Sequence, residues 1–242
     1  MGISTIVLFC SIVFIAAIVQ GVSGFAFGMI VLMVLPHIFG HTSALAVTNL
    51  TALLMLLYNS YLYRKYANWS WIPLAVTVLA TTDFVGILIL KHVGDNPLWH
   101  TLMGALFIIM ALYLLWGQSK LQIRPGRCSL IISMSLCGFI TGMFAVGGPI
   151  AAAFFLVATK TKEEYLGTMQ IVIASVTCID VLMRALNGMY TLELVKFSLI
   201  GVVFTIAGIL LARKIVRHID ALMLRRIVCI VMALDGLVTL LR

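Results

Sequence analysis

Long apolar stretches separated by short polar segments dominate the pattern of residues along the chain. Several of them come close to the roughly 20 residues that a helix needs to cross the hydrocarbon core of a bilayer. They cover residues 44–63, 71–90, 98–116, 165–183, 194–211 and 222–241. Each of these stretches predicts a full transmembrane helix.

Two further apolar regions are interrupted by glycine. Residues 3–35 are broken at "QGVSG" (residues 20–24), and residues 130–158 are broken at "VGGP" (residues 146–149). Each break is expected to leave two shorter pieces. Backbone that is not helical is costly in lipid, because its N–H and C=O groups lose their hydrogen bonds there. We therefore expect both breaks to be sheltered between helices, where broken helices usually line a substrate cavity.

The composition predicts one membrane domain over residues 1–242. The chain is 63% hydrophobic and 10% charged, with a mean hydropathy of +1.17, and the short gaps leave no room for an extramembrane domain. The net charge of +8 does not indicate a nucleic-acid partner, because basic residues gather in the cytoplasmic loops of membrane proteins. The cysteines form no C-x-x-C pair and the histidines lie near span ends, so neither a metal site nor a cofactor is expected.

The two halves of the chain resemble each other. "GILILKHV" at residues 86–93 matches "GILLARKI" at residues 208–215, and "IIMALYLL" at 108–115 matches "IVMALDGL" at 230–237. Both pairs have the same offset of 122 residues. A constant offset predicts a tandem duplication, and each copy would hold one broken segment followed by three full helices. The expected boundaries are about 1–119 for repeat one, about 128–242 for repeat two and about 118–127 for the linker.

The basic residues indicate how the broken segments lie. If each segment were a single kinked crossing, the 16 basic residues would divide equally between the two sides and give no orientation. If each segment enters and returns to its starting side, most of them share one side: Arg64, Lys65, Lys120, Arg124, Arg127, Lys160, Lys162, Arg213, Lys214, Arg217, Arg225 and Arg226. The remaining ones are Lys91, Arg184, Lys196 and Arg242. The second arrangement has the asymmetry that the positive-inside rule expects.

A re-entrant hairpin followed by three crossings inverts the second half relative to the first. The expected fold is therefore an all-α polytopic membrane protein of two inverted repeats, each a broken hairpin plus three transmembrane helices. In this arrangement the linker is cytoplasmic, and both termini lie outside the cell (plasma or inner) membrane.

The two breaks also predict a binding site. Gly147-Gly148-Pro149 is typical of a helix start, because proline loses no hydrogen bond at the first helical position. The segment from Gly24 to Gly28 would begin a matching short helix that ends before Pro36. Two helix N-termini that converge near the midplane present N–H groups and partial positive charge, which suit a small anion. The alternative is that these glycines only let helices pack closely.

The broken segments, "GVSGFAFGMIVLMVLP" and "GFITGMFAVGGPIAAAFF", resemble those of the sulfite exporter TauE/SafE family, and the similarity extends over the whole chain. The resemblance implies export or uptake of sulfite, sulfonates and related small organosulfur anions. By position it implies glycine turns at Gly21, Gly24, Gly28, Gly138, Gly142, Gly147 and Gly148, and a polar patch at Asn49, Thr51, Thr168 and Gln170. Ala26 and Phe27 stand where the family often has further glycines, so the first half-site is bulkier.

Three more residues complete the predicted substrate site. Ser23 aligns near Thr141 in the second half, and Pro149 follows the second glycine turn. Ser23 would act as a hydrogen-bond donor beside the turn. The polar patch of the neighbouring helices could instead form packing hydrogen bonds between those helices.

Asp83, Asp180 and Asp235 fall within predicted spans, where ionisable groups are costly and suggest a function. Asp180 lies four residues before Arg184 on one helix face, which predicts a structural ion pair. Asp83 and Asp235 have no such neighbour in the sequence. Either could carry a proton coupled to anion movement, or be hydrogen-bonded to neighbouring helices.

These features favour a transporter of small anions that works by alternating access at a midplane site, and not an enzyme, and they leave proton coupling open. An anion channel of the same architecture is the alternative, although facing half-helices are more typical of an occluded site than of a pore. G-x-S-G also occurs in rhomboid-like intramembrane proteases, but Ser23 would need a histidine base, and no histidine falls in the middle of a span. The sequence leaves open the anion, the direction of transport, the coupling ion and the formation of a homodimer.

Reporter fusions test the inverted arrangement. A reporter fused after Gln122 should lie in the cytoplasm, and one fused after Arg242 should lie outside, because the basic loops stay cytoplasmic. Paired reporters that are active on opposite sides of the membrane measure both positions. A cytoplasmic C-terminus would exclude the inverted repeat.

Overall fold

The computed structural model describes residues 3–93, 97–112, 125–144 and 147–215, together with Ala233 and Leu237. This part of the chain is helical and contains no strand. In chain order the helices are α1 (Ile3–Ser23), α2 (Phe27–Leu32), α3 (Leu35–Phe39), α4 (His41–Tyr63), α5 (Ile72–Val93), α6 (Pro97–Leu112), α7 (Arg127–Phe144), α8 (Gly148–Ala158), α9 (Lys162–Leu186) and α10 (Leu192–Ile215). The predicted all-α fold is confirmed.

Among the described helices, 6 are long and apolar enough to cross a membrane. Four of them, α4, α5, α9 and α10, match the predicted spans 44–63, 71–90, 165–183 and 194–211. The other two are α1 and α7, the first arms of the broken regions. The predicted span 98–116 falls on α6, which is described as far as Leu112. Of the predicted span 222–241, the structure describes Ala233 and Leu237, and the rest lies outside the described residues.

The first arms of the broken regions are longer than expected. α1 has 21 residues, which corresponds to about 30 Å of helix, and α7 has 18. α1 continues through Gly21, and α7 continues through Gly138 and Gly142. The prediction of two short pieces is therefore wrong for the first arms. It holds for the second arms, since α2 has 6 residues and α8 has 11.

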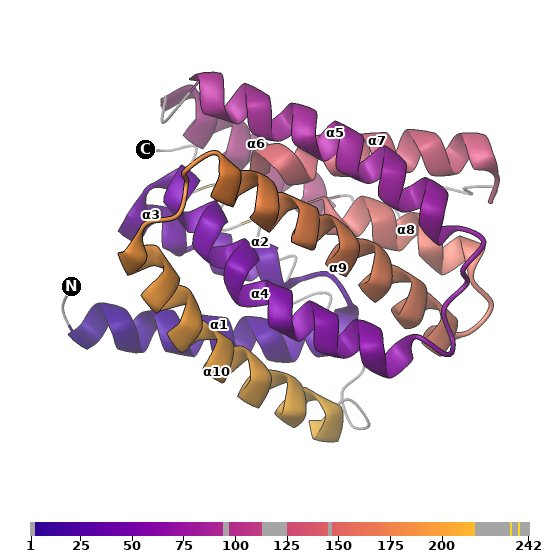
Figure 1. Ribbon diagram of the computed structural model, residues 1–242, viewed down its shortest axis with the longest axis horizontal. Helices are drawn as coiled ribbons and strands as arrows, with labels where there is room; N and C mark the ends of the chain where they lie inside the picture. The colour runs from indigo at the N-terminus through magenta and orange to yellow at the C-terminus, as the bar shows by residue number, and fades with distance from the viewer. Residues whose placement is uncertain are drawn as a thin grey trace.

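The long helices form three packed pairs (Figure 1). α4 and α9 pack against each other in the middle, α1 pairs with α10 on one side, and α5 pairs with α7 on the other. Contacts of α10 with α4 and of α5 with α9 join the pairs. The short α2 contacts α4, and the short α8 contacts α9. The interior is thus built around the central pair and the two short helices.

The central pair is antiparallel. Asn49 donates a hydrogen bond to Asp180, and Ser60 donates one to the carbonyl of Gln170. Asn68, which follows α4, donates one to Glu164. Residue numbers therefore rise along α4 as they fall along α9.

The outer pairs run parallel, because the residue numbers of the contacting positions rise together in α1 and α10 and in α5 and α7. An inverted repeat would produce this arrangement, because each outer pair then joins the first helix of one half to a later helix of the other. The repeat, with its boundaries, stays a prediction.

Glycines let the outer pairs approach backbone to backbone. A Cβ atom at Gly86 of α5 would lie 2.7 Å from the carbonyl oxygen of Phe139 on α7, and one at Gly142 of α7 would collide with the carbonyl of Asp83. In the other pair, a Cβ at Gly21 of α1 would lie 2.7 Å from the Cβ of Ala212 on α10. These contacts support close helix packing as the role of such glycines.

The buried apolar side chains form two clusters. One gathers around α1, α2 and α4, and the other around α5, α7, α8 and α9. Phe25, Ile150 and Ile173 pack against both clusters. Phe25 and Ile150 come from the two broken regions, so the breaks lie where the two clusters meet.

The contact between α5 and α7 predicts the effect of a single methyl group. In Gly142→Ala the new Cβ would collide with rigid backbone, so the helices must move apart, and overpacking of this kind costs about 1–3 kcal/mol. We expect the midpoint of thermal unfolding in detergent to fall by several degrees. Leu136→Ala, on the exposed face of the same helix, is the control and should change the midpoint less. Equal midpoints for Gly142→Ala and the unaltered protein would show that the two helices are not tightly packed there.

Candidate functional site

The first break is held by one buried amide side chain. Gly24 has φ +86°, a left-handed conformation that glycine adopts without strain, and it turns the chain at the end of α1. The Gln20 side chain donates to the Gly24 carbonyl (2.9 Å), and its oxygen accepts from the N–H of Phe27, which opens α2 (2.9 Å). Gln20 therefore joins the two sides of the break and satisfies backbone groups that cannot be left unpaired in an apolar interior.

Side chains of α9 support the same turn from the second half of the chain. The Gln170 amide donates to the Gly24 carbonyl (3.3 Å), and the Tyr165 hydroxyl donates to the Ser23 carbonyl (3.2 Å). Ser23 itself donates to the Val19 carbonyl (2.9 Å) and accepts from the Phe25 N–H (3.4 Å). The polar residues around the first break thus hold its backbone in place.

The second break packs against α7 and against the first break. A Cβ atom at Gly147 would collide with the Cys137 carbonyl and the Thr141 hydroxyl of α7. α8 then begins at Gly148, with Pro149 in its first turn as expected. A Cβ at Gly148 would lie 2.9 Å from the Cβ of Phe25 and 3.1 Å from its carbonyl oxygen. The two breaks are therefore in direct contact.

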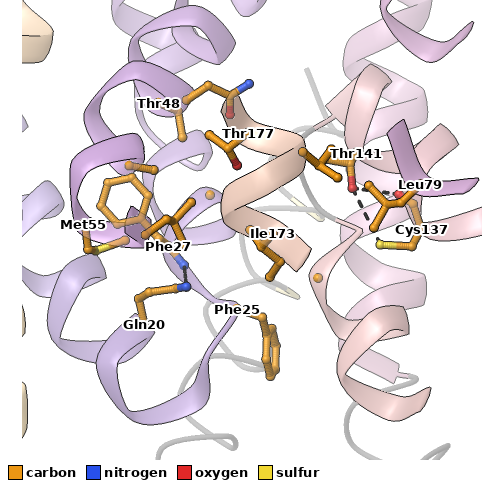
Figure 2. Close-up of a pocket in the computed structure, with 16 residues that line it drawn as sticks. Gln20, Phe25, Phe27, Thr48, Met55, Leu79, Cys137, Thr141, Ile173 and Thr177 are labelled. Atoms are coloured by element: carbon orange, nitrogen blue, oxygen red, sulfur yellow. Dashed lines mark hydrogen bonds between the residues drawn. The ribbon is translucent and has the colours of Figure 1, made fainter. Parts of the chain in front are cut away.

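A cavity of about 80 Å³ lies between the two breaks and the central helices. Figure 2 shows Thr48 and Thr177 at one end of it, Phe25 at the other, and Thr141 with Cys137 on the side of α7. A volume of this size holds several water molecules or a small oxyanion. Its polar lining comprises Gln20, Thr48, Asn49, Thr141 and Thr177, and its apolar lining includes Phe25, Phe27, Met55, Leu79, Ile173 and Val176. The lining residues carry no full charge.

Three groups of the lining can donate a hydrogen bond to a ligand. In the described part of the chain the Thr177 hydroxyl forms no hydrogen bond, and Asn49 uses one of its two amide hydrogens for Asp180. Gly148 places the N-terminal end of α8, with its partial positive charge, in the cavity wall. By contrast, the N–H of Phe27 at the start of α2 is already bonded to Gln20.

The cavity brings together four of the residues predicted from the sequence, namely Gly28, Asn49, Thr141 and Gly148. Five others lie at the two breaks. Gly24 and Gln170 form the supported turn, Gly147 packs on α7, and Ser23 and Pro149 flank the breaks.

Five predicted residues lie elsewhere. Three are glycines within helices: Gly21 of α1 contacts α10, and Gly138 and Gly142 of α7 contact α5. Thr51 lies against Gly201 of α10. The Thr168 hydroxyl accepts a hydrogen bond from the N–H of Asn68, beyond the end of α4 (2.9 Å). The expectation that Gly21 and Gly28 help to break the first helix is wrong, since Gly21 lies within α1 and Gly28 within α2.

Several lining residues were not predicted, above all Gln20, Thr48 and Thr177. Gln20 is a polar residue at the end of a long apolar run and opens the "QGVSG" break, which is a signal that the sequence did contain. Thr48 and Thr177 are single threonines in apolar helices. Such residues commonly bond to their own helix, as Thr48 does to Ala44 (2.7 Å), so the sequence does not distinguish them.

A buried charged cluster adjoins the cavity. Arg184 and Asp180 form the predicted ion pair (Nε to Oδ1, 2.7 Å), and the amide of Asn49 donates to the other oxygen of Asp180. Arg184 also donates to the Gly142 carbonyl (3.4 Å). Asp83 lies in the same environment and interacts electrostatically with Asp180 and Arg184. Asp235 lies outside the described residues.

The geometry gives no support to a serine nucleophile. In the described part of the chain, Ser23 forms hydrogen bonds with the backbone of its own turn. The ring of His41 lies instead at the Met143 carbonyl (3.2 Å). A serine without a base is a weak nucleophile. Among the described residues there is likewise no cluster of three His, Cys, Asp or Glu side chains that could hold a metal ion.

One comparison with known proteins is informative. The family model described as sulfite exporter TauE/SafE matches residues 9–239, which is nearly the whole chain. No curated protein and no solved structure matches the chain.

The role of Gln20 predicts a specific loss of stability. Gln20→Leu leaves the Phe27 N–H unpaired and removes one of the two donors to the Gly24 carbonyl, and an unsatisfied buried group costs about 1–3 kcal/mol. We expect the midpoint of thermal unfolding in detergent to fall by several degrees. Ser11→Ala is the control, because it removes an exposed hydrogen bond to Val7 on the same helix. If both variants unfold at the same temperature, Gln20 does not hold the break.

Proposed function

Because the chain belongs to the sulfite exporter TauE/SafE family, we propose that it transports small sulfur oxyanions, sulfite or short organosulfonates, through the cavity between its two helix breaks. Its family and its apolar helices make it a multi-pass membrane protein of transporter type. In this proposal it lies in the cell membrane with both termini outside, and the anion moves by alternating access.

The cavity is the observation that carries the proposal. Its donors are neutral: the Thr177 hydroxyl, the Asn49 amide and the N-terminal end of α8. Neutral donors and a helix N-terminus stabilise an oxyanion without an opposite charge in the lining. A site of this kind can release the anion again, which a carrier requires.

The apolar part of the lining supports the inclusion of organosulfonates. Phe25, Phe27, Met55 and Ile173 provide surface against which a short alkyl group can pack. The sulfonate oxygens would then lie toward Asn49 and Thr177. Sulfite has no alkyl group and would use the polar end alone.

Proton coupling is the second part of the proposal, and we assign it to Asp83. This aspartate is 1% exposed, and its Oδ1 has no hydrogen-bond partner among the described residues. An ionisable group at such a position inside a membrane protein is a common element of proton relays. Asp235 remains a second predicted coupling residue.

The Thr177 hydroxyl offers a direct test of the site. Thr177→Val keeps the shape of the side chain but removes the donor, and a hydrogen bond to an anion contributes about 1.5–3 kcal/mol. The dissociation constant for sulfite and for ethanesulfonate should therefore rise by roughly tenfold or more. Ligand-induced thermal shifts of the purified protein measure the affinity, and uptake into proteoliposomes measures transport.

Thr77→Val is the matched control. Thr77 lies on the exposed face of α5, where its hydroxyl bonds to the Pro73 carbonyl, and its replacement should leave affinity and uptake unchanged. Equal affinities for Thr177→Val and Thr77→Val would place the anion elsewhere. Accelerated exchange by unlabelled anion on the far side would support a carrier, whereas flux that rises linearly with concentration would favour the channel of the same architecture.

A further inference from the structure

The buried cluster beside the cavity contains more negative than positive charge. Asp83, Asp180 and Arg184 are 1%, 3% and 0% exposed. When all three are ionised, two carboxylates face one guanidinium, which leaves one net negative charge. A net charge buried among apolar helices is strongly unfavourable.

Two polar atoms of this cluster are unsatisfied. Oδ1 of Asp83 and Nη1 of Arg184 have no hydrogen-bond partner among the described residues. The ion pair with Asp180 uses Nε of Arg184, and Nη2 donates to the Gly142 carbonyl. Gly142 packs directly against the backbone of Asp83. Arg184 is thus committed to Asp180, and among the described residues Asp83 is the carboxylate that keeps an unpartnered oxygen, Oδ1.

The cluster is joined to the cavity in two ways. Asn49 lines the cavity and donates to Asp180. On α9, Ile173, Val176 and Thr177 line the cavity, and Asp180 and Arg184 follow on the same helix face at spacings of three and four residues. Thr177 and Asp180 are separated by about 4.5 Å of helix rise. An anion in the cavity therefore lies next to a negatively charged cluster.

We propose that Asp83, Asp180 and Arg184 form a binding site for one proton, and that this proton and the substrate anion bind together and cross the membrane in the same direction. The inference rests on the proposed function for the identity of the anion. The proton adds to a carboxylate oxygen of Asp83 and cancels the net charge of the cluster. No other bond changes.

The direction of coupling follows from the sign of the charges. An anion in the cavity repels an ionised cluster and does not repel a neutral one, so it binds more tightly when the proton is present. By linkage, the anion increases the affinity for the proton by the same factor. One proton and one singly charged anion together carry no net charge, so the loaded carrier has the same net charge as the empty one with the cluster ionised. The geometry therefore favours symport over exchange of anion for proton.

Other titratable groups surround Asp83 and must be separated from it. The helices packed against α5 contribute Asp180 and Arg184 from α9 and the thiol of Cys137 from α7. His41 of α4 lies at the Met143 carbonyl, next to Gly142. Tyr190 lies near Asp180, and burial raises the pKa of its phenol, so it stays protonated. His41 is the group whose titration would most easily be mistaken for that of Asp83.

Proton uptake on anion binding tests the proposal. Ethanesulfonate is the probe, because a sulfonate keeps its single charge and does not titrate. Added to the purified protein in weakly buffered solution with a pH indicator, it should cause uptake of up to one proton per bound anion. Its dissociation constant should rise by up to tenfold per pH unit where the cluster loses its proton. Wild-type protein that binds the anion without proton uptake, or with proton release, overturns the proposal.

Variants assign the proton to its site. Asp83→Asn should bind ethanesulfonate with a dissociation constant that no longer depends on pH, and in proteoliposomes it should keep anion exchange but lose accumulation driven by an acidic exterior. Asp83→Glu should restore both pH dependence and accumulation. His41→Gln should behave as the wild type. Unchanged proton uptake in Asp83→Asn, or its loss in His41→Gln, contradicts the assignment.

A separate measurement keeps the proton site testable if the substrate is different. Infrared spectra of the protein without ligand should show a protonated carboxyl band that disappears as the pH rises and is absent in Asp83→Asn. If no sulfur oxyanion binds but this band is present, the proposed function fails and the proton site stands. If the band is unaffected by Asp83→Asn, the proton site fails whichever anion is transported.

Discussion

Hydrogen bonding of the backbone where α1 ends and α2 begins is the constraint on which the rest of the structure depends. Three residues, 24–26, separate the two helices and lie among apolar side chains, where unpaired N–H and C=O groups are costly. The Gln20 side chain donates to the Gly24 carbonyl and accepts from the Phe27 N–H. Gln170, from the second half of the chain, also donates to the Gly24 carbonyl. The turn at Gly24 can then be sharp enough to bring α2 back into the interior.

The cavity is a consequence of that turn. Because α2 folds back, Phe25 meets the start of α8 at Gly148, and the two breaks come into contact. Side chains cannot fill the space around two interrupted helices as they do around continuous ones. The glycine contacts of α1 with α10 and of α5 with α7 hold the outer helices close, so the remaining space is small and lies in the middle of the protein.

The charged cluster gives this small space its electrostatic character. Arg184 is fully buried, yet it is directed to Asp180 and the Gly142 carbonyl and does not line the cavity. In the part of the chain that the structure describes, Asn49 is the residue that both lines the cavity and bonds to the cluster. Binding of an anion and the charge state of the cluster are therefore expected to affect each other, because Asn49 connects them and charges interact strongly in an apolar interior.

The sequence by itself determined the features that depend on local order: the apolar spans, the two breaks, the helix start at Gly148-Pro149 and the ion pair of Asp180 with Arg184, whose partners are four residues apart. Tertiary structure decided which residues meet. Gly21 and Gly28 look alike in the sequence, yet one packs against α10 and the other lines the cavity. The link from Asn49 to Asp180 joins residues 131 positions apart. Helix periodicity gives the face of each residue, but only the packing of helices against one another sets what that face contacts.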